Sequence, residues 1–579
     1  MKQEEYTFYR NFESRYDLIE KYDDNSLLLY ALQLKYSIED IDEVATDSLV
    51  DGSDDKKADL VYIDGENQEA VIAQGFVSQK DRDEAPSNKA SDLNTAVTWL
   101  LTRQIEDLPV RIKSAARELR QKISDNEIRR ITVWYSHNCP ESENVRQELI
   151  SVEHSLSSIL REHYSDKEIE SHSKEVGLET LEEWYQGLTI PILMTDEVEI
   201  ANCNGFESVG EDWTSYSTSL SAVTLYNLYK SHGTALFSAN VRDYLGSRRS
   251  DSNINNSIKN SAINSPYKFF VFNNGITALV NDFKYEDESK ILIISGLSIV
   301  NGAQTTGAIG SLNDPPSENM QVPIRFIKCG NPDTVASIVK YNNSQNKINA
   351  PDFRSNDQHQ RRITAEFDTI PQIEYTSRRG GAADIIRRNL NVLPSVTAGQ
   401  VLAAFHGEPS IAYNDKSKIW DSDRLYSQFF NDQTSAKHIL LCYSLMKTIE
   451  DLKIELLNLN GDLLEEQKNL LEFLRSRGSI ILFTTAIADC LEILLSRRIP
   501  NKFSVEFRRN VSLDEGKRIW RPIIDIGISF VNQLNAGLQD GIKNQQRIND
   551  ARSTFASFMG AVKGANSQIV ATFASEIKN

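Results

Sequence analysis

The pattern of apolar and polar positions changes along the chain, and the first 200 residues mix helical and strand patterns. Residues 13–45 place apolar side chains mostly three or four positions apart, which predicts helix. Two short runs rich in β-branched and aromatic residues, 58–64 and 70–78, predict a β-hairpin around a polar turn at 65–69. A helix should open near Ser91, with Ser91 or Asp92 as its cap. Further strands are expected at 131–136 and 190–200, with a helix at 140–163 between them.

Beyond residue 205 the chain is richer in Asn, Ser, Gly and Arg, and we expect strands at 269–272, 291–295 and 322–327. From about residue 436 onward the apolar spacing is almost wholly helical. These changes predict a mixed α/β (α+β) fold in three domains. The predicted domains are 1–204 and 205–430, both α/β, and a helical domain at 431–579.

Composition narrows the classes of function. The 63 Lys and Arg against 82 Asp and Glu give a formal charge of −19, which excludes a protein that coats nucleic acid through bulk positive charge. A local basic groove remains compatible with that total. The five cysteines are scattered without a CxxC pair, as expected in a reducing cytoplasm. The most apolar stretch, 479–495, carries two acidic residues and falls short of the roughly 20 apolar residues that span a bilayer. We therefore predict a cytoplasmic protein that does not enter the membrane.

Several standard catalytic motifs are missing from the sequence. The eight histidines show no H-E-x-x-H spacing, and the chain has neither a Walker loop nor a G-x-S-x-G elbow. Zinc proteases, P-loop NTPases and α/β-hydrolases are thereby excluded as models for the chemistry.

Carboxylates gather around the predicted hairpin. Asp54, Asp55 and Asp59 lie just before or at its first strand, and Gln74 lies within its second strand. Oxygen ligands of this kind hold Mg²⁺ or Mn²⁺ in enzymes that cleave phosphodiesters. The order of a helix, an Asp and then Glu or Gln on the paired strand resembles the PD-(D/E)XK nuclease superfamily. That resemblance implies that Asp59 and Gln74 hold the metal, with Asp55 as a further catalytic residue.

The resemblance has one clear departure, because Phe76 stands where the superfamily has its lysine. Lys56, Lys57 or Lys89 could supply the missing ammonium group in space, and we choose Lys89, at the entry of the next helix, as the catalytic lysine. The preceding helix could add a carboxylate from Glu39, Asp42 or Glu43. The alternative interpretation is a solvated acidic turn on a nuclease fold that has lost its chemistry.

Two apolar runs in the middle of the chain end in Asn-Gly turns. One is 269–277, with the sequence FFVFNNGIT, and the other is 297–309, in which IVNGAQTT opens an expected helix. A strand that leads through glycine to a helix N-terminus can bind an anion through free N–H groups, although such junctions are also common as purely structural elements. The candidate phosphate-binding residues are Asn273, Asn274, Gly275, Asn301, Gly302, Gln304 and Thr305.

These two motifs, with 236–246 upstream and 341–348 downstream, closely resemble the AIPR family, named for abortive infection phage resistance. The resemblance covers about residues 230–360 and continues more loosely toward the C-terminus. It implies a bacterial antiphage defence protein and supports a restriction-endonuclease-like domain in front of an AIPR core, because the family often carries one there.

Arginines are frequent in the same middle segment. Arg242, Arg325 and the pair Arg378 and Arg379, followed by two glycines, are candidates for contacts to phosphate. They could instead neutralise nearby carboxylates. The sequence thus predicts a divalent-metal-dependent nuclease that acts on DNA or RNA. The alternative is a non-catalytic nucleic-acid or nucleotide sensor in a defence complex. A partner protein from a defence locus and homo-oligomerisation through the C-terminal helices are further expectations.

Overall fold

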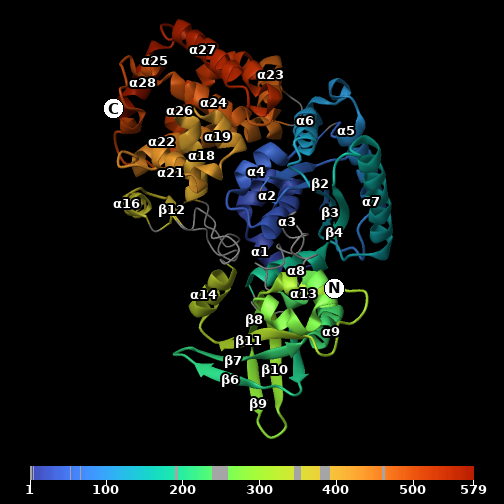
Figure 1. Cartoon of the computed structure of the whole chain (residues 1–579). Coiled ribbons are helices and arrows are strands. Elements are labelled where there is room, and N and C mark those ends of the chain that lie inside the picture. The colour runs from blue at the N-terminus through green and yellow to red at the C-terminus, as the bar shows by residue number, and fades with distance from the viewer. Residues whose placement is uncertain are drawn as a thin grey trace.

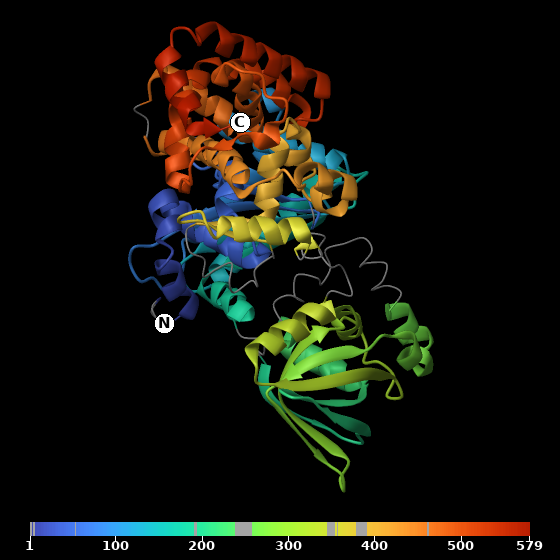
Figure 2. The same ribbon diagram turned by 90° about the vertical axis from the view of Figure 1, so that its left-hand side faces the viewer.

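The protein is represented by a computed structural model that describes residues 3, 6–52, 54–65, 67–189, 194–237, 258–343, 354–355, 357–377, 391–459 and 463–578. The fold is mixed α/β, as the sequence predicts. In Figure 1 an N-terminal unit lies between a helical region at the top and a β-rich unit at the bottom, and Figure 2 shows the same order from the side.

The N-terminal unit is a four-stranded sheet between two layers of helices. The strand order is β1-β2-β3-β4, with β1 antiparallel to β2 and the other pairs parallel. Its elements are α1 (Thr7–Glu13), α2 (Tyr16–Tyr22), α3 (Ser26–Tyr36), α4 (Ile41–Ser48), β1 (Leu60–Asp64), β2 (Glu69–Phe76), α5 (Ser87–Thr102), α6 (Val110–Ser124), β3 (Arg130–His137), α7 (Glu143–His163), β4 (Glu170–Val176) and α8 (Leu178–Thr189).

Strand β2 shows why this sheet is covered on both sides. Ala70 and Ile72 pack into a core with α5, α6 and α7, whereas Val71 and Ala73 pack into a second core with α3. Alternate residues of a strand point to opposite faces, so a strand buried on both faces needs a continuous apolar run. That run ends at Gln74, and the polar end of β2 is where the candidate site lies.

The elements expected at 13–163 are confirmed with two corrections; of the strand expected at 190–200, residues 190–193 lie outside the described residues and Met194–Ile200 is a strand of the β-rich unit. The hairpin of β1 and β2 forms in antiparallel register. The helical stretch at 13–45 is divided among α2, α3 and α4, with breaks at Asp23 and Ser37, whose φ angles are 44° and 50°. Helix α5 begins at Ser87 and not near Ser91, because Pro86 precedes it with φ −64° and sets the chain into the helix without a side-chain cap.

The β-rich unit is a seven-stranded sheet of order β5-β10-β8-β11-β7-β6, with β9 paired to β10. The expected strands at 291–295 and 322–327 are confirmed within β10 and β11. Its elements are β5 (Met194–Ile200), β6 (Gly205–Val209), β7 (Trp213–Ser221), α9 (Ala222–His232), α12 (Phe269–Phe272), β8 (Ile276–Val280), β9 (Asp282–Glu286), β10 (Ile291–Asn301), α13 (Ala303–Gly310), β11 (Gln321–Cys329) and α14 (Pro332–Asn343).

The strand expected at Phe269–Phe272 is wrong, because these residues form the short helix α12. A 3₁₀ turn at Pro266–Lys268, with proline at its first position, leads directly into them. Only Phe269 is buried, whereas Val271 and Phe272 are exposed. Aromatic and β-branched residues favour a strand here. The 3₁₀ turn that begins at Pro266 instead leads the backbone into a helix.

The helical region shares one large apolar core that runs from Ile363 to Ile577. Its elements are α16 (Gln358–Phe367), β12 (Glu374–Thr376), β13 (Val392–Pro394), α18 (Ser395–Phe405), α19 (Pro409–Asn414), α20 (Lys418–Asp421), α21 (Asp423–Phe429), α22 (Ala436–Asn458), α23 (Glu465–Arg475), α24 (Ser479–Asp489), α25 (Leu491–Leu495), β14 (Glu506–Phe507), α26 (Leu513–Gly527), a 3₁₀ segment (Ile528–Gly541), α27 (Gln545–Val562), α28 (Ser567–Glu576) and β15 (Ile577–Lys578).

Within the described residues, no single helix has the length and apolar character needed to cross a membrane. The helices Glu465–Arg475 and Ser479–Leu495 pass that test only as a pair, which bends by 106° at the break between them. The five cysteines are free thiols, and four of them are buried.

Candidate metal centre

The loop between α4 and β1, residues 49–59, carries the acidic cluster, and we call it the aspartate loop. Its two ends are joined: Leu49 and Leu60 form a β-bridge, and the Val50 and Asp51 N–H groups donate to the Asp59 carbonyl oxygen at 2.9 and 3.2 Å. This closure brings Asp51, at the start of the loop, beside Asp59, at its end. Residues that are separated along the chain therefore share one small volume.

Asp51, Asp55 and Asp59 each offer a carboxylate oxygen within 4.8 Å of the other two. Asp55 is oriented by its own loop, because its carboxylate accepts hydrogen bonds from the N–H groups of Gly52 (3.1 Å) and Lys57 (2.8 Å). Like charges at this separation repel one another, so the arrangement favours a cation among them. Of the described residues, these three make the only group of His, Cys, Asp and Glu side chains close enough to share a metal ion.

Asp51 and Asp59 are each held by a neighbouring element. The Asn25 side-chain amide donates to Asp51 Oδ2 at 2.7 Å, and the Gly75 N–H of β2 donates to Asp59 Oδ2 at 2.7 Å. Each of these carboxylates still has a second oxygen that can bind a ligand. The hairpin partner strand thus positions the residue that the sequence singled out, Asp59.

Gln74 supplies an independent observation. Its side chain is 6% exposed, and within the described structure its buried Oε1 atom has no hydrogen-bond partner. A buried amide oxygen without a partner is costly unless something binds it. Gln74 lines the same cavity of about 530 Å³ as the three aspartates. The cavity is lined by Asp24, Asn25, Asp51, Gly52, Asp54, Asp55, Lys56, Lys57, Asp59, Gln74, Gly75, Lys89 and Thr95.

Lys89 reaches this cavity from the first turn of α5. Its Nζ lies 5.1 Å from the ring centroid of Phe76, the residue for which the sequence resemblance predicts a lysine. Helix α5 therefore places the ammonium group of Lys89 at the Gln74–Phe76 end of β2, where it contacts the face of the Phe76 ring. Lys56 and Lys57 also line the cavity, but they form ion pairs with Asp54 and Asp92.

The donor set fits Mg²⁺ or Mn²⁺. Three carboxylates and an amide oxygen are hard ligands, which these ions prefer over nitrogen or sulfur. The structure brings Asp55, Asp59, Gln74 and Lys89 together and adds Asp51, which the sequence reasoning missed. Asp51 opens the polar turn that follows the helix, and only the closure of the loop onto Asp59 shows its place in the cluster.

The carboxylates proposed from the preceding helix are engaged elsewhere. Asp42 accepts a hydrogen bond from Tyr22 at 2.6 Å and pairs with Lys21 at 3.1 Å. Glu43 pairs with Lys416 of the helical region at 2.9 Å. Glu39 is also absent from the metal-binding group among the described residues. Asp42 and Glu43 therefore contact α2 and the helical region, and neither belongs to the aspartate cluster, so this part of the sequence prediction is wrong.

The pKa of Asp59 is raised to about 7, chiefly because the carboxyl group is partly shielded from water and in smaller part because the Asp51 and Asp55 carboxylates lie nearby. The Gly75 N–H and the charge of Lys89 act in the opposite direction. Because the pKa in the folded state lies above the unfolded value near 3.8, the folded state disfavours the ionised form. The metal-free protein therefore loses stability as the pH rises from about 4 to 7, and that loss persists above pH 7.

Replacing Asp59 with Asn removes this loss. In EDTA at pH 8, we expect Asp59→Asn to be more stable than the wild type by about 2 kcal/mol, and at pH 4 we expect no difference. Thermal unfolding at the two pH values measures this. A stability difference that is independent of pH would contradict the assignment of a half-buried carboxylate whose ionisation destabilises the folded state.

The two central Asn-Gly motifs meet in the β-rich unit. The Asn273 side-chain amide donates to Thr305 Oγ1 at 2.9 Å, while Asn273 Oδ1 accepts the Gly275 N–H at 2.9 Å. Gly302 has φ 94°, and a Cβ there would lie 2.9 Å from the Gly275 carbonyl oxygen, so close packing of the turns requires glycine. The Asn273 side chain is thus hydrogen-bonded to other residues of the two turns through both its amide nitrogen and its amide oxygen. Asn274 is exposed, and Asn301 and Gln304 are half-buried.

The candidate arginines divide into two groups. Arg325, on β11, donates to Thr277 Oγ1 at 3.3 Å and to Asn342 Oδ1 at 3.2 Å, so its side chain links β8 to α14. Arg242, Arg378 and Arg379 lie outside the described residues. A role for any of these arginines in phosphate binding stays a prediction.

Comparison with known proteins bears on the central and helical parts of the chain. Residues 237–515 match the family model of the AIPR protein. The AIPR match contains both Asn-Gly motifs, which confirms the resemblance drawn from them. It also reaches through α22 and α24 into α26, and it leaves the aspartate loop and the four-stranded sheet outside. No curated protein and no solved structure matches the chain.

Proposed function

We propose that this chain is an antiphage defence protein whose N-terminal unit hydrolyses phosphodiester bonds in DNA or RNA with the help of Mg²⁺ or Mn²⁺. The AIPR match supports the defence role. The observation that carries the nuclease role is the convergence of Asp51, Asp55 and Asp59 beside the unpartnered amide oxygen of Gln74.

Each residue of the centre has a distinct part in this proposal. Asp51, Asp55, Asp59 and Gln74 would hold the ion through oxygen atoms. A bound divalent ion supplies Lewis-acid stabilisation of the charge that develops on a phosphate. Lys89, placed over Phe76, attracts the phosphate and orients the attacking water by donating hydrogen bonds. Gly75 fixes Asp59 in place through its N–H group.

Cleavage assays with the full chain test the proposal. Labelled single-stranded and double-stranded DNA and RNA are incubated with Mg²⁺, with Mn²⁺ or with EDTA. We expect cleavage of at least one substrate with either ion and none in EDTA, because the crowded carboxylates need the cation. Absence of cleavage under all conditions would contradict the nuclease role.

The alternative function is a non-catalytic sensor that retains the fold, and the observation that favours it is Phe76 at the lysine position of β2. It predicts that the chain binds Mn²⁺ and nucleic acid but does not cleave the nucleic acid. The same assays therefore distinguish the two functions.

A further inference from the structure

The helical region contacts the N-terminal unit at the two elements that bracket the aspartate loop. Helix α4 ends just before this loop, and β1 begins just after it. Figures 1 and 2 both show the helical region packed against the N-terminal unit, with α4 on the side that faces it in Figure 1. Many contacts across this boundary are made by charged side chains that are themselves buried.

Two cations of the helical region bind main-chain carbonyl groups on either side of the loop. Lys453, on α22, donates from Nζ to the Thr46 carbonyl oxygen near the end of α4. Arg477, between α23 and α24, donates from its guanidinium group to the Val61 carbonyl oxygen on β1. Lys453 is 4% exposed and Arg477 9%. Because both side chains are buried, they cannot replace these hydrogen bonds with hydrogen bonds to water.

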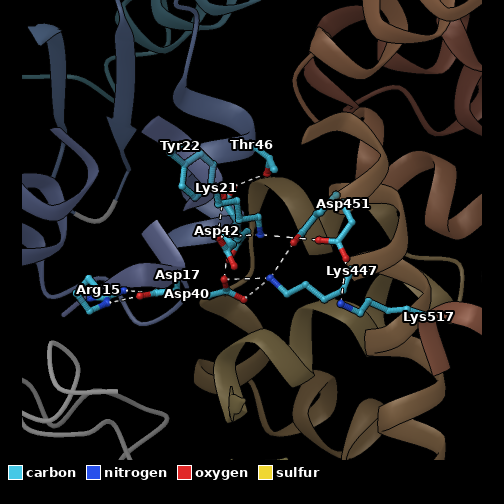
Figure 3. A network of polar contacts seen from close by, with 12 residues as sticks. Arg15, Asp17, Lys21, Tyr22, Asp40, Asp42, Thr46, Lys447, Asp451 and Lys517 are labelled. Atoms are coloured by element: carbon cyan, nitrogen blue, oxygen red, sulfur yellow. Dashed lines mark hydrogen bonds and ion pairs between the residues drawn. The ribbon is translucent and has the colours of Figure 1, made fainter. Parts of the chain in front are cut away.

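Further contacts hold the start of α4. Asp40 caps this helix by accepting the Glu43 N–H at 3.2 Å, and its carboxylate also pairs with Lys447 of α22 at 3.0 Å. Figure 3 shows Lys447 extending from the helical region toward Asp40. The Gln400 amide and Lys416 both bind Glu43 Oε1, each at 2.9 Å. Helix α4 is thus held at both ends by side chains of the helical region.

Arg477 is also fixed on its other side. Its guanidinium group pairs with Glu118 of α6 at 3.0 Å, and the main-chain N–H of Arg477 donates to Ser114 Oγ at 2.8 Å. Buried ion pairs of this kind gain little net stability because both charges lose water, but they have strict geometric requirements. They therefore specify one docked position of the helical region relative to α4 and β1.

We propose that Lys453 and Arg477 are positioning residues for the metal centre. By holding the carbonyl groups of Thr46 and Val61, they fix the two ends of the aspartate loop and so the separation of Asp51 and Asp59. The assignment rests on the proposed function of the site and adds that the centre is complete only when the helical region is docked.

Hydrogen exchange of the full chain tests the positioning role without metal. Lys453→Met removes one contact while keeping the length of the side chain, and Arg477→Gln removes the other. We expect amide exchange in residues 49–59 to rise at least about tenfold in each variant. The matched control is Lys543→Gln, which removes a more exposed ion pair to Asp125 (3.0 Å) across the same boundary but away from the loop. Loop exchange in this control should stay within about twofold of the wild type.

The same variants are then titrated with Mn²⁺. Loss of a contact that orients metal ligands typically weakens binding by about 10- to 100-fold, so we expect at least a tenfold weaker affinity in both variants. Unchanged loop exchange in Lys453→Met and Arg477→Gln would overturn the positioning role. A rise that extends equally to β11 would also overturn it, because that result reports general unfolding. If loop exchange rises but the wild type binds no Mn²⁺, the positioning role stands and the metal function falls.

Discussion

Asp59→Ala is expected to abolish metal-dependent cleavage, with a loss of at least about a thousandfold in rate. A metal ion contributes several kcal/mol of charge stabilisation in phosphoryl chemistry, and each 1.4 kcal/mol or so is a factor of ten. Among the proposed ligands, Asp59 is oriented by the Gly75 N–H, and it shares one cavity with the other carboxylates and Gln74. The rate is measured on the substrate that the wild type cleaves fastest.

The matched control for this variant is Asp64→Asn, at the far end of β1. Asp64 accepts the main-chain N–H of Asn67 at 3.0 Å and the Asn67 side-chain amide at 2.8 Å. An amide oxygen at position 64 can keep the first contact, and the same charge is lost from the same hairpin. We expect cleavage by Asp64→Asn to stay within about twofold of the wild type. Equal cleavage by wild type and Asp59→Ala would remove the proposed active site.

Lys89→Met should lower the cleavage rate by about a hundredfold while leaving Mn²⁺ affinity within about threefold. In the proposed site, Lys89 would act on the substrate and water, because its ammonium group cannot ligate a cation and lies 5.1 Å from the centroid of the Phe76 ring. General acid–base and orienting groups typically contribute about 10²- to 10⁴-fold. Single-turnover cleavage and a Mn²⁺ titration on the same preparation separate the two effects.

A second substitution makes this prediction more specific. Because Lys89 lies over Phe76, Phe76→Lys in the Lys89→Met background returns an ammonium group to that end of β2. We expect about a tenfold recovery of the rate lost in Lys89→Met. An equal loss of Mn²⁺ affinity and rate in Lys89→Met would contradict a role toward the substrate and would make Lys89 part of the metal centre.

The hairpin and four members of the candidate site could be predicted from the sequence because they depend on local patterns. Short apolar runs rich in β-branched residues define β1 and β2, and the end of the second run at Gln74 shows where the strand becomes polar. The strand partners then bring Asp59 and Gln74 close together. Lys89 follows at the start of the next helix, where its short sequence distance made it a reasonable candidate.

Asp51 and the contacts of the helical region could not be predicted in this way. The position of Asp51 depends on hydrogen bonds from Val50 and Asp51 to the Asp59 carbonyl oxygen, and these close a loop with no regular period. The contacts of Lys453 and Arg477 join segments more than 400 positions apart along the chain. Helical periodicity identified α22 as apolar and amphipathic, but it could not show which buried cation reaches another unit.

Mn²⁺ binding by the wild type and by Asp51→Asn tests the central claim most directly. Asp51 entered the site only through the folded structure, so the outcome depends on the geometry of the cluster and not on a sequence motif. Electron paramagnetic resonance counts bound Mn²⁺ per chain at pH 8. The proposed centre predicts one ion per wild-type chain and at least about a tenfold weaker affinity in Asp51→Asn. No bound ion in the wild type, or equal affinity in the two proteins, would contradict a metal centre in the aspartate loop.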